Sequence, residues 1–139
     1  MYNGHFKPKP IETEYGHFDS RSEYERYLVL LDMERNGAIT DLKRQVSFNL
    51  LPQQTKVVRK QLKTKIKEVI KVVEQDMVYT CDFTYYNKDG EFIAEEFKGN
   101  KYCIDEGVRI KKKLLYYMHG IELKFSFPPK KEKKKKAAK

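Results

Sequence analysis

The sequence has few of the residues on which several common kinds of site depend. Its 139 residues include two cysteines and three histidines, too few for a disulfide framework and too scattered for a Cys/His zinc site. No apolar run is long enough to span a membrane, and the first residues lack the charged-then-apolar order of a secretory signal. These absences predict a cytoplasmic protein without disulfides or structural zinc.

Several sequence motifs of enzymes are also missing. The chain has no glycine-rich phosphate loop of the P-loop or dinucleotide type, no Gly-x-Ser-x-Gly elbow, no His-Glu-x-x-His pair and no EF-hand loop. Each of these motifs positions the backbone or side-chain groups that its reaction or ligand requires. Their absence disfavours ATP-dependent, NAD-dependent and zinc-hydrolase reactions.

Positive charge is abundant but unevenly distributed. The formal net charge is +9 at pH 7. Residues 130–139 hold seven lysines and one glutamate, so this lysine-rich tail supplies +6 and the rest of the chain +3. The composition predicts a nucleic-acid partner attracted by local basic patches, with the tail adding a salt-sensitive contribution that ignores sequence. The alternative is that the tail is a solvated appendage without a specific task.

The segment from Tyr79 to Gly99 predicts two β-strands joined by a tight turn. In the first strand, apolar and aromatic side chains alternate with polar ones, and this period of two predicts one face toward the core. Asp82 belongs to the other face. The predicted core face consists of Tyr79, Cys81, Phe83 and Tyr85.

The turn between these strands determines which residues meet Asp82. Residues 87–90, Asn-Lys-Asp-Gly, suit a type I turn followed by a left-handed glycine. The resulting three-residue loop pairs its first residue with Glu91. Counting back from that pair places Asp82 opposite Glu96, whereas Glu95 points to the other face. A slip of one residue would exchange the two glutamates, so the choice of Glu96 depends on the turn.

Lys98 joins the two acids on the same face, and this set matches the needs of metal-dependent phosphodiester cleavage. Two carboxylates can hold Mg²⁺ through hard oxygen ligands, and a lysine can orient a water and counter charge developing on phosphorus. Only Glu96-Phe-Lys98 follows a hairpin with an inward-facing Asp and precedes a glycine. The four (Asp/Glu)-x-Lys triplets begin at Asp41, Glu96, Glu122 and Glu132.

A helix is predicted to begin at Ser20, because Ser20 followed by Glu23 forms a capping box. Asn36-Gly37 should end it. Glu23 has two interpretations: a residue that only caps the helix, or a third acid directed at the hairpin site. The predicted buried stripe of the helix consists of Tyr24, Tyr27, Leu28 and Leu31.

Two basic segments flank the hairpin. Residues 57–74 fit both a helical stripe and, through their β-branched content, a strand; we favour a helix over 58–73. A second helix is predicted over Val108 to Met118, ending at Gly120. Strands are predicted at Val46 to Leu50 and at Ile121 to Phe127. The expected phosphate-contacting cations are Lys60, Lys63, Lys67, Arg109, Lys111, Lys112 and Lys113.

Taken together, these motifs resemble a family of small phage-associated proteins, long labelled a domain of unknown function, within the PD-(D/E)xK nuclease superfamily. The resemblance runs from about Thr13 to Lys124. Cys81 stands where the superfamily name has proline, and the region 56–74 is longer and more basic than the family pattern. The motifs that carry the likeness are Thr13-Glu14, Tyr15-Gly16, Phe18 to Glu23, Arg26 to Leu28, Ile39 to Leu42, Gln45, Phe48, Leu50, Tyr79-x-x-Asp82-Phe83-x-Tyr85, Glu95 to Gly99 and Arg109 to Leu114.

The resemblance implies a restriction-endonuclease-like core and assigns roles to four residues. Asp82 and Glu96 would be the metal-binding pair, and Lys98 the superfamily lysine. Glu23 would be the helix-borne acid of related resolvases, which helps with a metal or water. The implied cofactor is Mg²⁺, with Mn²⁺ as a substitute, and the implied products carry a 5′-phosphate and a 3′-hydroxyl. If the protein is phage-encoded, its location is the cytoplasm of a bacterial host cell.

We therefore predict one α/β domain over residues 1–129, with a mixed central β-sheet flanked by helices, an extended arm at 1–15 and a flexible tail at 130–139. The predicted function is that of a Mg²⁺-dependent DNA endonuclease, with a Holliday junction or other branched DNA as substrate and a homodimer as one fitting assembly. An alternative is a non-catalytic, basic nucleic-acid-binding phage protein. A third is a purely structural protein.

Overall fold

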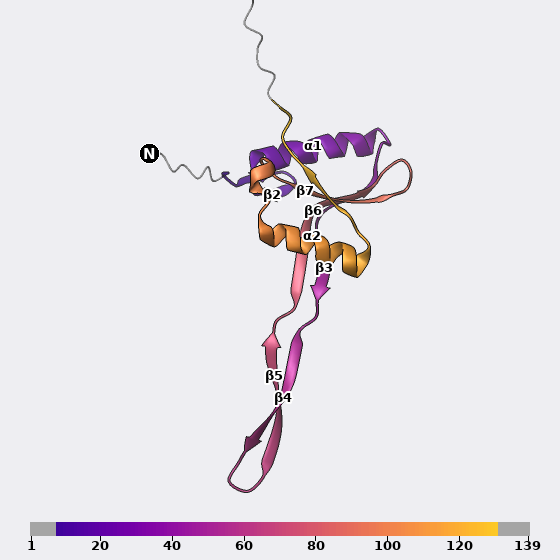
Figure 1. The fold of residues 1–139 in the computed structure, drawn as a ribbon. Helices are drawn as coiled ribbons and strands as arrows, with labels where there is room; N and C mark the ends of the chain where they lie inside the picture. The colour runs from indigo at the N-terminus through magenta and orange to yellow at the C-terminus, as the bar shows by residue number, and fades with distance from the viewer. Residues whose placement is uncertain (1–7, 131–139) are drawn as a thin grey trace, which may run out of the picture.

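The computed structural model describes residues 8–130 and has a small α/β body from which a long two-stranded arm projects (Figure 1). Residues 131–139 of the tail predicted at 130–139, and the first seven residues of the predicted arm, lie outside the described residues. The elements are β1 (Ile11–Thr13), β2 (Gly16–Phe18), α1 (Arg21–Arg35), β3 (Thr40–Leu51), β4 (Gln54–Gln61), β5 (Ile66–Glu74), β6 (Met77–Tyr86), β7 (Phe92–Phe97), η1 (Lys101–Cys103), α2 (Glu106–His119) and β8 (Leu123–Ser126).

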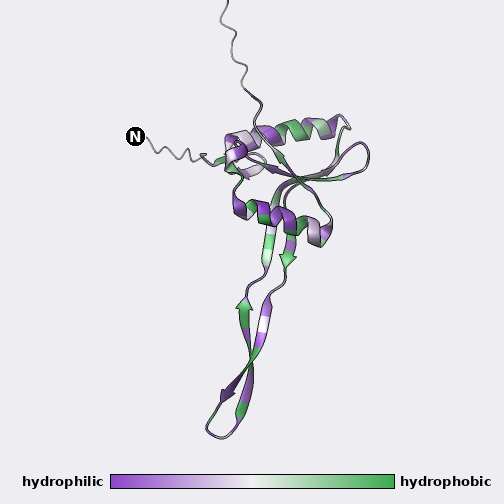
Figure 2. Cartoon of the chain, in the orientation of Figure 1, coloured by the Kyte–Doolittle hydropathy of each residue, from purple (hydrophilic) through white to green (hydrophobic). Residues whose placement is uncertain are grey.

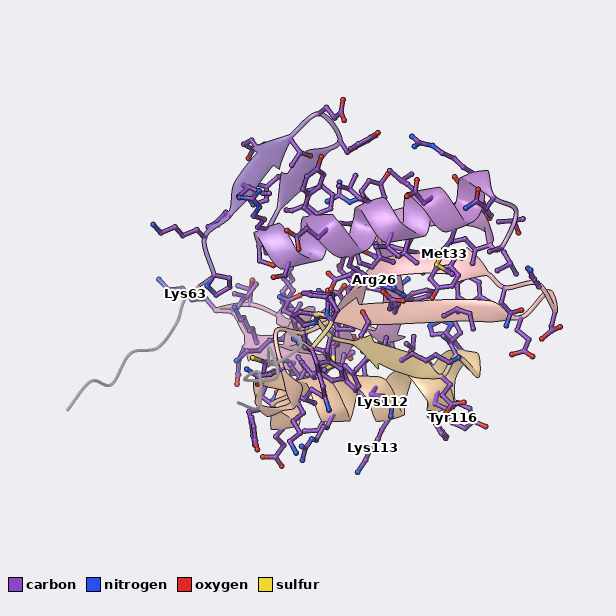
Figure 3. The ribbon with its side chains drawn as sticks, turned by 90° about the horizontal axis from the view of Figure 1, so that it is seen from above. Arg26, Met33, Lys63, Lys112, Lys113 and Tyr116 are labelled. Carbon is purple, nitrogen blue, oxygen red and sulfur yellow. The ribbon has the colours of Figure 1, made fainter. Side chains whose placement is uncertain are left out.

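The body is built on a four-stranded mixed sheet in the order β3-β6-β7-β8. The first three strands are antiparallel neighbours, and β8 runs parallel to β7 after the crossover through α2. The sheet lies between α1 and α2 (Figure 3). One buried cluster includes Leu30 of α1 and another includes Leu115 of α2. Within residues 8–130, neither helix is both long and apolar enough to cross a lipid bilayer.

The capping residue Ser20 begins α1 where predicted, whereas α2 begins at Glu106, two residues before the predicted Val108. The Ser20 hydroxyl accepts a hydrogen bond from the Glu23 backbone N–H at 3.1 Å, and α1 is capped at its other end by Asn36. In α2, the Asp105 carboxylate accepts from the backbone N–H of Val108. Gly120 ends this helix in the left-handed conformation, with φ 67°.

The buried face of α1 differs from the predicted stripe. Leu28 is exposed, and the side chains that α1 buries fully are Glu23 and Leu30. The helix is therefore rotated relative to the expectation, although Tyr27 of the predicted stripe does stack on Phe83 of the sheet, at a ring-centroid distance of 6.0 Å. This rotation turns an acidic residue, rather than an apolar one, into the protein interior at the start of the helix.

The hairpin register is the predicted one. Asn87 donates its backbone N–H to the Glu91 carbonyl, and Gly90, with φ 78°, closes the turn by donating to Asn87. The β6–β7 pairs run from Tyr86 with Phe92 to Phe83 with Glu95. Asp82 and Glu96 each lie one residue beyond this last pair, at the point where the two strands separate.

The helix favoured over 58–73 is wrong, because this region forms the antiparallel strands β4 and β5. The β-branched residues pair across the two strands, for example Val57 with Ile70 and Val58 with Val69. The arm also extends the ladder between β3 and β6, and the Gln53 side chain donates to that of Gln75 at 3.0 Å where the two ladders meet. Pairing with a neighbouring chain segment therefore overrides the helical periodicity.

The start of the described chain is a short hairpin rather than the extended arm predicted for 1–15. Residues Ile11–Thr13 pair with Gly16–Phe18. Arg44 of β3 holds this hairpin, since its guanidinium lies 3.7 Å from the Phe18 ring centroid and donates to the carbonyls of Tyr15 and His17. The hairpin covers the first turn of α1.

Candidate active site

The candidate site lies where β6 and β7 separate. Their ladder ends at Phe83 and Glu95. Beyond this pair, the Asp82 carboxylate accepts a hydrogen bond from the Phe97 backbone N–H at 2.9 Å. The Lys98 backbone N–H turns to the carbonyl of Ser126 on β8. This fork opens a space between the strands next to Asp82, Glu96 and Lys98.

A kink in the neighbouring strand positions Asp82. Gln45 of β3 has a left-handed backbone, with φ 53°, and the β3–β6 ladder has no pair between Gln45 and Asp82. The Gln45 side-chain amide instead donates to Asp82 Oδ1 at 3.3 Å. Gln45 was expected only as part of the family resemblance, and no local signal predicts its left-handed conformation.

The kink also corrects the predicted alternation in β6. Tyr79 and Cys81 pack in the cluster that contains Leu115 of α2, whereas Phe83 and Tyr85 pack in the cluster that contains Leu30 of α1. The strand therefore changes faces at Asp82. All four aromatic and thiol side chains are buried as predicted, but on two sides of the sheet.

Glu96 is held between a tyrosine and a lysine. The Tyr79 hydroxyl donates a hydrogen bond to Glu96 Oε2. The ammonium of Lys98 lies 3.6 Å from Glu96 Oε1, and both side chains are largely buried. Tyr79 was predicted only as a core residue, so its hydrogen bond to the acid is a contribution that the sequence pattern did not reveal.

Glu23 lies at the same site while its backbone N–H takes part in capping α1. It is 5% exposed. Its side chain lines a cavity of about 500 Å³ together with Asp82, Glu96 and Lys98. The two interpretations of Glu23 are therefore compatible, because the Ser20 hydroxyl accepts from its backbone N–H, and its carboxylate lines the cavity while also bonding to the Asp19 backbone N–H.

The acids of the cavity disfavour one another's ionisation. Burial, followed by the charges of Asp82 and Asp19, raises the pKa of Glu23 to about 7. Burial also raises the pKa of Asp82. For Glu96, burial and then the charge of Asp82 raise the pKa. The single ammonium of Lys98 does not compensate the four carboxylates that line this cavity, which belong to Asp19, Glu23, Asp82 and Glu96.

Substitution of Glu23 by Gln is expected to stabilise the metal-free protein at pH 8 by roughly 3 kcal/mol. Its folded-state pKa of about 7 exceeds the reference value of 4.5, so ionisation costs stability progressively as pH rises from 4.5 to 7. The variant lacks this cost. Urea unfolding in EDTA between pH 4 and 8 measures the difference, which should vanish at the acidic end. Equal pH dependence in both proteins would contradict the buried, ionisable Glu23.

The carboxylate oxygens of this cavity are suitable ligands for a divalent cation, although the side chains are not arranged around a single ion position. No group of three Asp, Glu, His or Cys side chains within 8–130 is arranged to enclose an ion. Asp82 and Glu96 nevertheless offer hard oxygen ligands, and each is oriented by a further hydrogen bond, from Phe97 and Tyr79 respectively. These two residues could be ligands of Mg²⁺, and Glu23 lines the same cavity.

Glu95 points away from this cavity, as the turn register predicts. It accepts two hydrogen bonds from the Arg26 guanidinium, at 2.7 and 2.8 Å, and one each from Tyr85 and Ser126. Figure 3 shows Arg26 directed from α1 toward the sheet. Although burial alone raises the pKa of Glu95, its hydrogen bonds with Arg26 outweigh burial and lower it. Glu95 is therefore a structural partner of α1.

The predicted basic residues fall into two separate groups. Arg109, Lys112 and Lys113 line a cavity of about 740 Å³ beside β8, with Tyr116 and Phe125 (Figure 3). Lys111 is half-buried on the same helix. The other three cations are on the arm: Lys60 in β4, Lys67 in β5 and Lys63 in the loop between them.

Comparison with known proteins identifies a family but no characterised relative. Residues 3–136 match the family described as "Protein of unknown function (DUF1064)". Because the match covers nearly the whole chain, the chain belongs to this family. Neither a curated protein nor a solved structure matches the sequence.

Proposed function

We propose that this member of the DUF1064 family is a Mg²⁺-dependent DNA endonuclease of the PD-(D/E)xK type. The observation that carries the proposal is the fork between β6 and β7, where Asp82, Glu96 and Lys98 line one cavity with Glu23 of α1. The residues come from three elements, and their carboxylates are mutually destabilised in the absence of a counter-ion. A bound divalent cation would remove that repulsion.

Each side chain has a role in the proposed hydrolysis. Bound at Asp82 and Glu96, Mg²⁺ would supply Lewis-acid activation of water and of the scissile phosphate. Lys98 would orient the attacking water and counter negative charge on the phosphate. Glu23, whose pKa is raised to about 7, is suited to exchange a proton with that water near neutral pH. In-line attack leaves a 5′-phosphate and a 3′-hydroxyl.

The cavity beside β8, which Arg109, Lys112 and Lys113 line, would hold the DNA backbone next to the scissile bond. It is adjacent to the acidic cavity along the chain, because Cys103 lines the acidic cavity and the next residue, Ile104, lines the cavity beside β8. The guanidinium and ammonium groups of Arg109, Lys112 and Lys113 suit phosphates, while Tyr116 and Phe125 offer surfaces to sugars or bases. A branched substrate such as a Holliday junction is the first to test, and its two cuts would need two copies of the chain.

The test compares Glu96→Gln with Glu91→Gln, an exposed acid in the turn of the same hairpin. Wild type and Glu91→Gln are expected to cut junction, flap or duplex DNA with Mg²⁺ or Mn²⁺, and Glu96→Gln is not. Cleavage is measured on end-labelled strands, whose product ends also report the 5′-phosphate. Equal activity of wild type and Glu96→Gln on all substrates would overturn the proposal that the protein is a nuclease.

The second candidate function is non-catalytic binding of nucleic acid by a basic phage protein. The cationic arm favours it independently of the acidic site, because the arm lies outside the body (Figure 1). DNA affinity without metal-dependent cleavage would support this function and reject the first.

A further inference from the structure

The arm formed by β4 and β5 is a two-stranded sheet of its own that leaves the body without a covering layer (Figure 1). Between residues 54 and 74 the chain has seven lysine or arginine residues and two glutamates, a net charge of +5. Figure 2 shows apolar positions interspersed with these charges along the whole arm. An isolated two-stranded ribbon is marginally stable in water. We therefore expect a binding partner to stabilise the arm.

Directly opposed residues of an antiparallel pair point to the same face, so the register assigns the arm two faces. On one of them, two lysine pairs flank a pair of half-buried valines; we call it the lysine face. On the other face, an Arg59–Glu68 ion pair lies between the exposed apolar pair Val57–Ile70 and the mixed pair Gln61–Ile66. The lysine face consists of Lys56 with Lys71, Val58 with Val69, and Lys60 with Lys67.

The lysine pairs are unfavourable for the isolated protein. Like charges directly opposed on neighbouring strands destabilise a sheet, by several tenths of a kcal/mol to about 1 kcal/mol for each pair. Within residues 8–130, none of the four lysines lies within ion-pair distance of a carboxylate. A polyanion would remove this repulsion, whereas a second copy of the arm, also at +5, would add to it.

The spacing of the lysine pairs fits a duplex groove. Lys60 lies four positions after Lys56, which corresponds to about 14 Å along a strand. The major groove of B-DNA is about 12 Å wide and admits a two-stranded ribbon. Each pair would thus meet the phosphates on one rim of the groove, with Val58 and Val69 facing the space between the rims.

We propose that the β4–β5 arm lies across a groove of double-stranded DNA and clamps its two backbones with the lysine face. The inference rests on the proposed function only for the identity of the polyanion as DNA. It extends that function by assigning a duplex-binding element away from the acidic cavity. It also replaces the predicted basic helix, since Lys60 and Lys67 now form one pair and Lys63 lies in the terminal loop.

The experiment measures duplex binding in an Asp82→Asn background, in EDTA, so that cleavage has no part in the result. Fluorescence anisotropy with a duplex of about 20 base pairs gives Kd over a series of NaCl concentrations. Lys56→Gln/Lys71→Gln and Lys60→Gln/Lys67→Gln are each expected to raise Kd roughly tenfold and to reduce the salt slope by about 2. The charge-matched control is Lys43→Gln/Lys88→Gln, two exposed lysines of the body.

Equal salt slopes in the two arm variants and the body control would overturn the proposal. A second variant replaces residues 54–74 by an Asn-Gly turn, and it should lose at least as much binding as all four lysine substitutions combined, because it also removes Arg59, Lys63 and Lys65. Val57→Thr/Ile70→Thr tests the other face. If this change dissociates a dimer in light scattering while the lysine variants bind DNA normally, the arm is a self-association surface and the proposal fails. Arm-dependent binding without any cleavage by wild type would reject only the nuclease.

Discussion

Asp82→Asn is expected to lower Mg²⁺-dependent cleavage by about 10³-fold or more, because loss of a metal ligand removes several kcal/mol of transition-state stabilisation. The fold should persist. Asparagine has nearly the same volume, and its carbonyl oxygen can still accept the Phe97 backbone N–H that Asp82 accepts at 2.9 Å. Cleavage rates under single-turnover conditions, with circular dichroism as the control for folding, measure this effect.

The same substitution should abolish stabilisation by Mn²⁺. In wild type, a ligand at 100 times its Kd stabilises the folded state by about 2.7 kcal/mol. Thermal unfolding with and without Mn²⁺ therefore separates a metal-binding role from a structural one. If Asp82→Asn cuts DNA at the wild-type rate, or if Mn²⁺ stabilises both proteins equally, Asp82 is not a metal ligand.

Glu95→Ala is expected to destabilise the protein by about 3 to 5 kcal/mol, the usual cost of removing one partner of a buried ion pair. Glu95 is almost fully buried, and the Arg26 guanidinium that it binds is 27% exposed. Its lowered pKa has the same origin. This stabilisation is present above the reference pKa of 4.5 and is lost as pH falls through the lower, folded-state pKa. Urea unfolding at neutral and acidic pH measures both effects.

The matched control for Glu95 is the double variant Arg26→Met/Glu95→Leu, which removes the charge as well as its partner. It should recover part of the lost stability, since apolar side chains of similar volume often replace a buried ion pair without loss, whereas the Tyr85 and Ser126 hydroxyls still lose their acceptor. Cleavage by this variant would also separate Glu95 from catalysis. A cost below 1 kcal/mol for Glu95→Ala would contradict the structural role.

The parts of the fold that depend on local chemistry could be predicted from the sequence. Residues 87–90 determine the hairpin register by turn geometry alone, and this register distinguishes Glu96 from Glu95. Ser20 and Gly120 mark helix ends for equally local reasons. The mixed sheet between helices also agrees with the prediction, because alternating strands and amphipathic helices require such layers.

Features that depend on tertiary contacts could not be predicted in this way. Residues 57–74 have both helical and strand periodicity, and only pairing across the arm decides between them. The left-handed Gln45 and the change of face at Asp82 arise where the neighbouring strands β3 and β6 are kinked. The sequence of neither strand has a local signal for its kink. The position of Glu23 depends on the rotation of α1, which buries Glu23 and Leu30 and leaves Leu28 exposed, and the helix sequence has no local signal for it.

The chain leads from the arm through β5 and β6 directly to the candidate site, so the number of residues between them limits the distance from the lysine face to the cavity. Only two residues separate β5 from β6, so eleven residues lead from Lys71 on the lysine face to Asp82 in the cavity. At about 3.4 Å per residue they span at most roughly 37 Å, close to the 34–36 Å of one turn of B-DNA. The proposed cut would therefore fall within about ten base pairs of the groove that the arm occupies. A junction whose duplex arms are shorter than one turn would engage the cavity without the clamp.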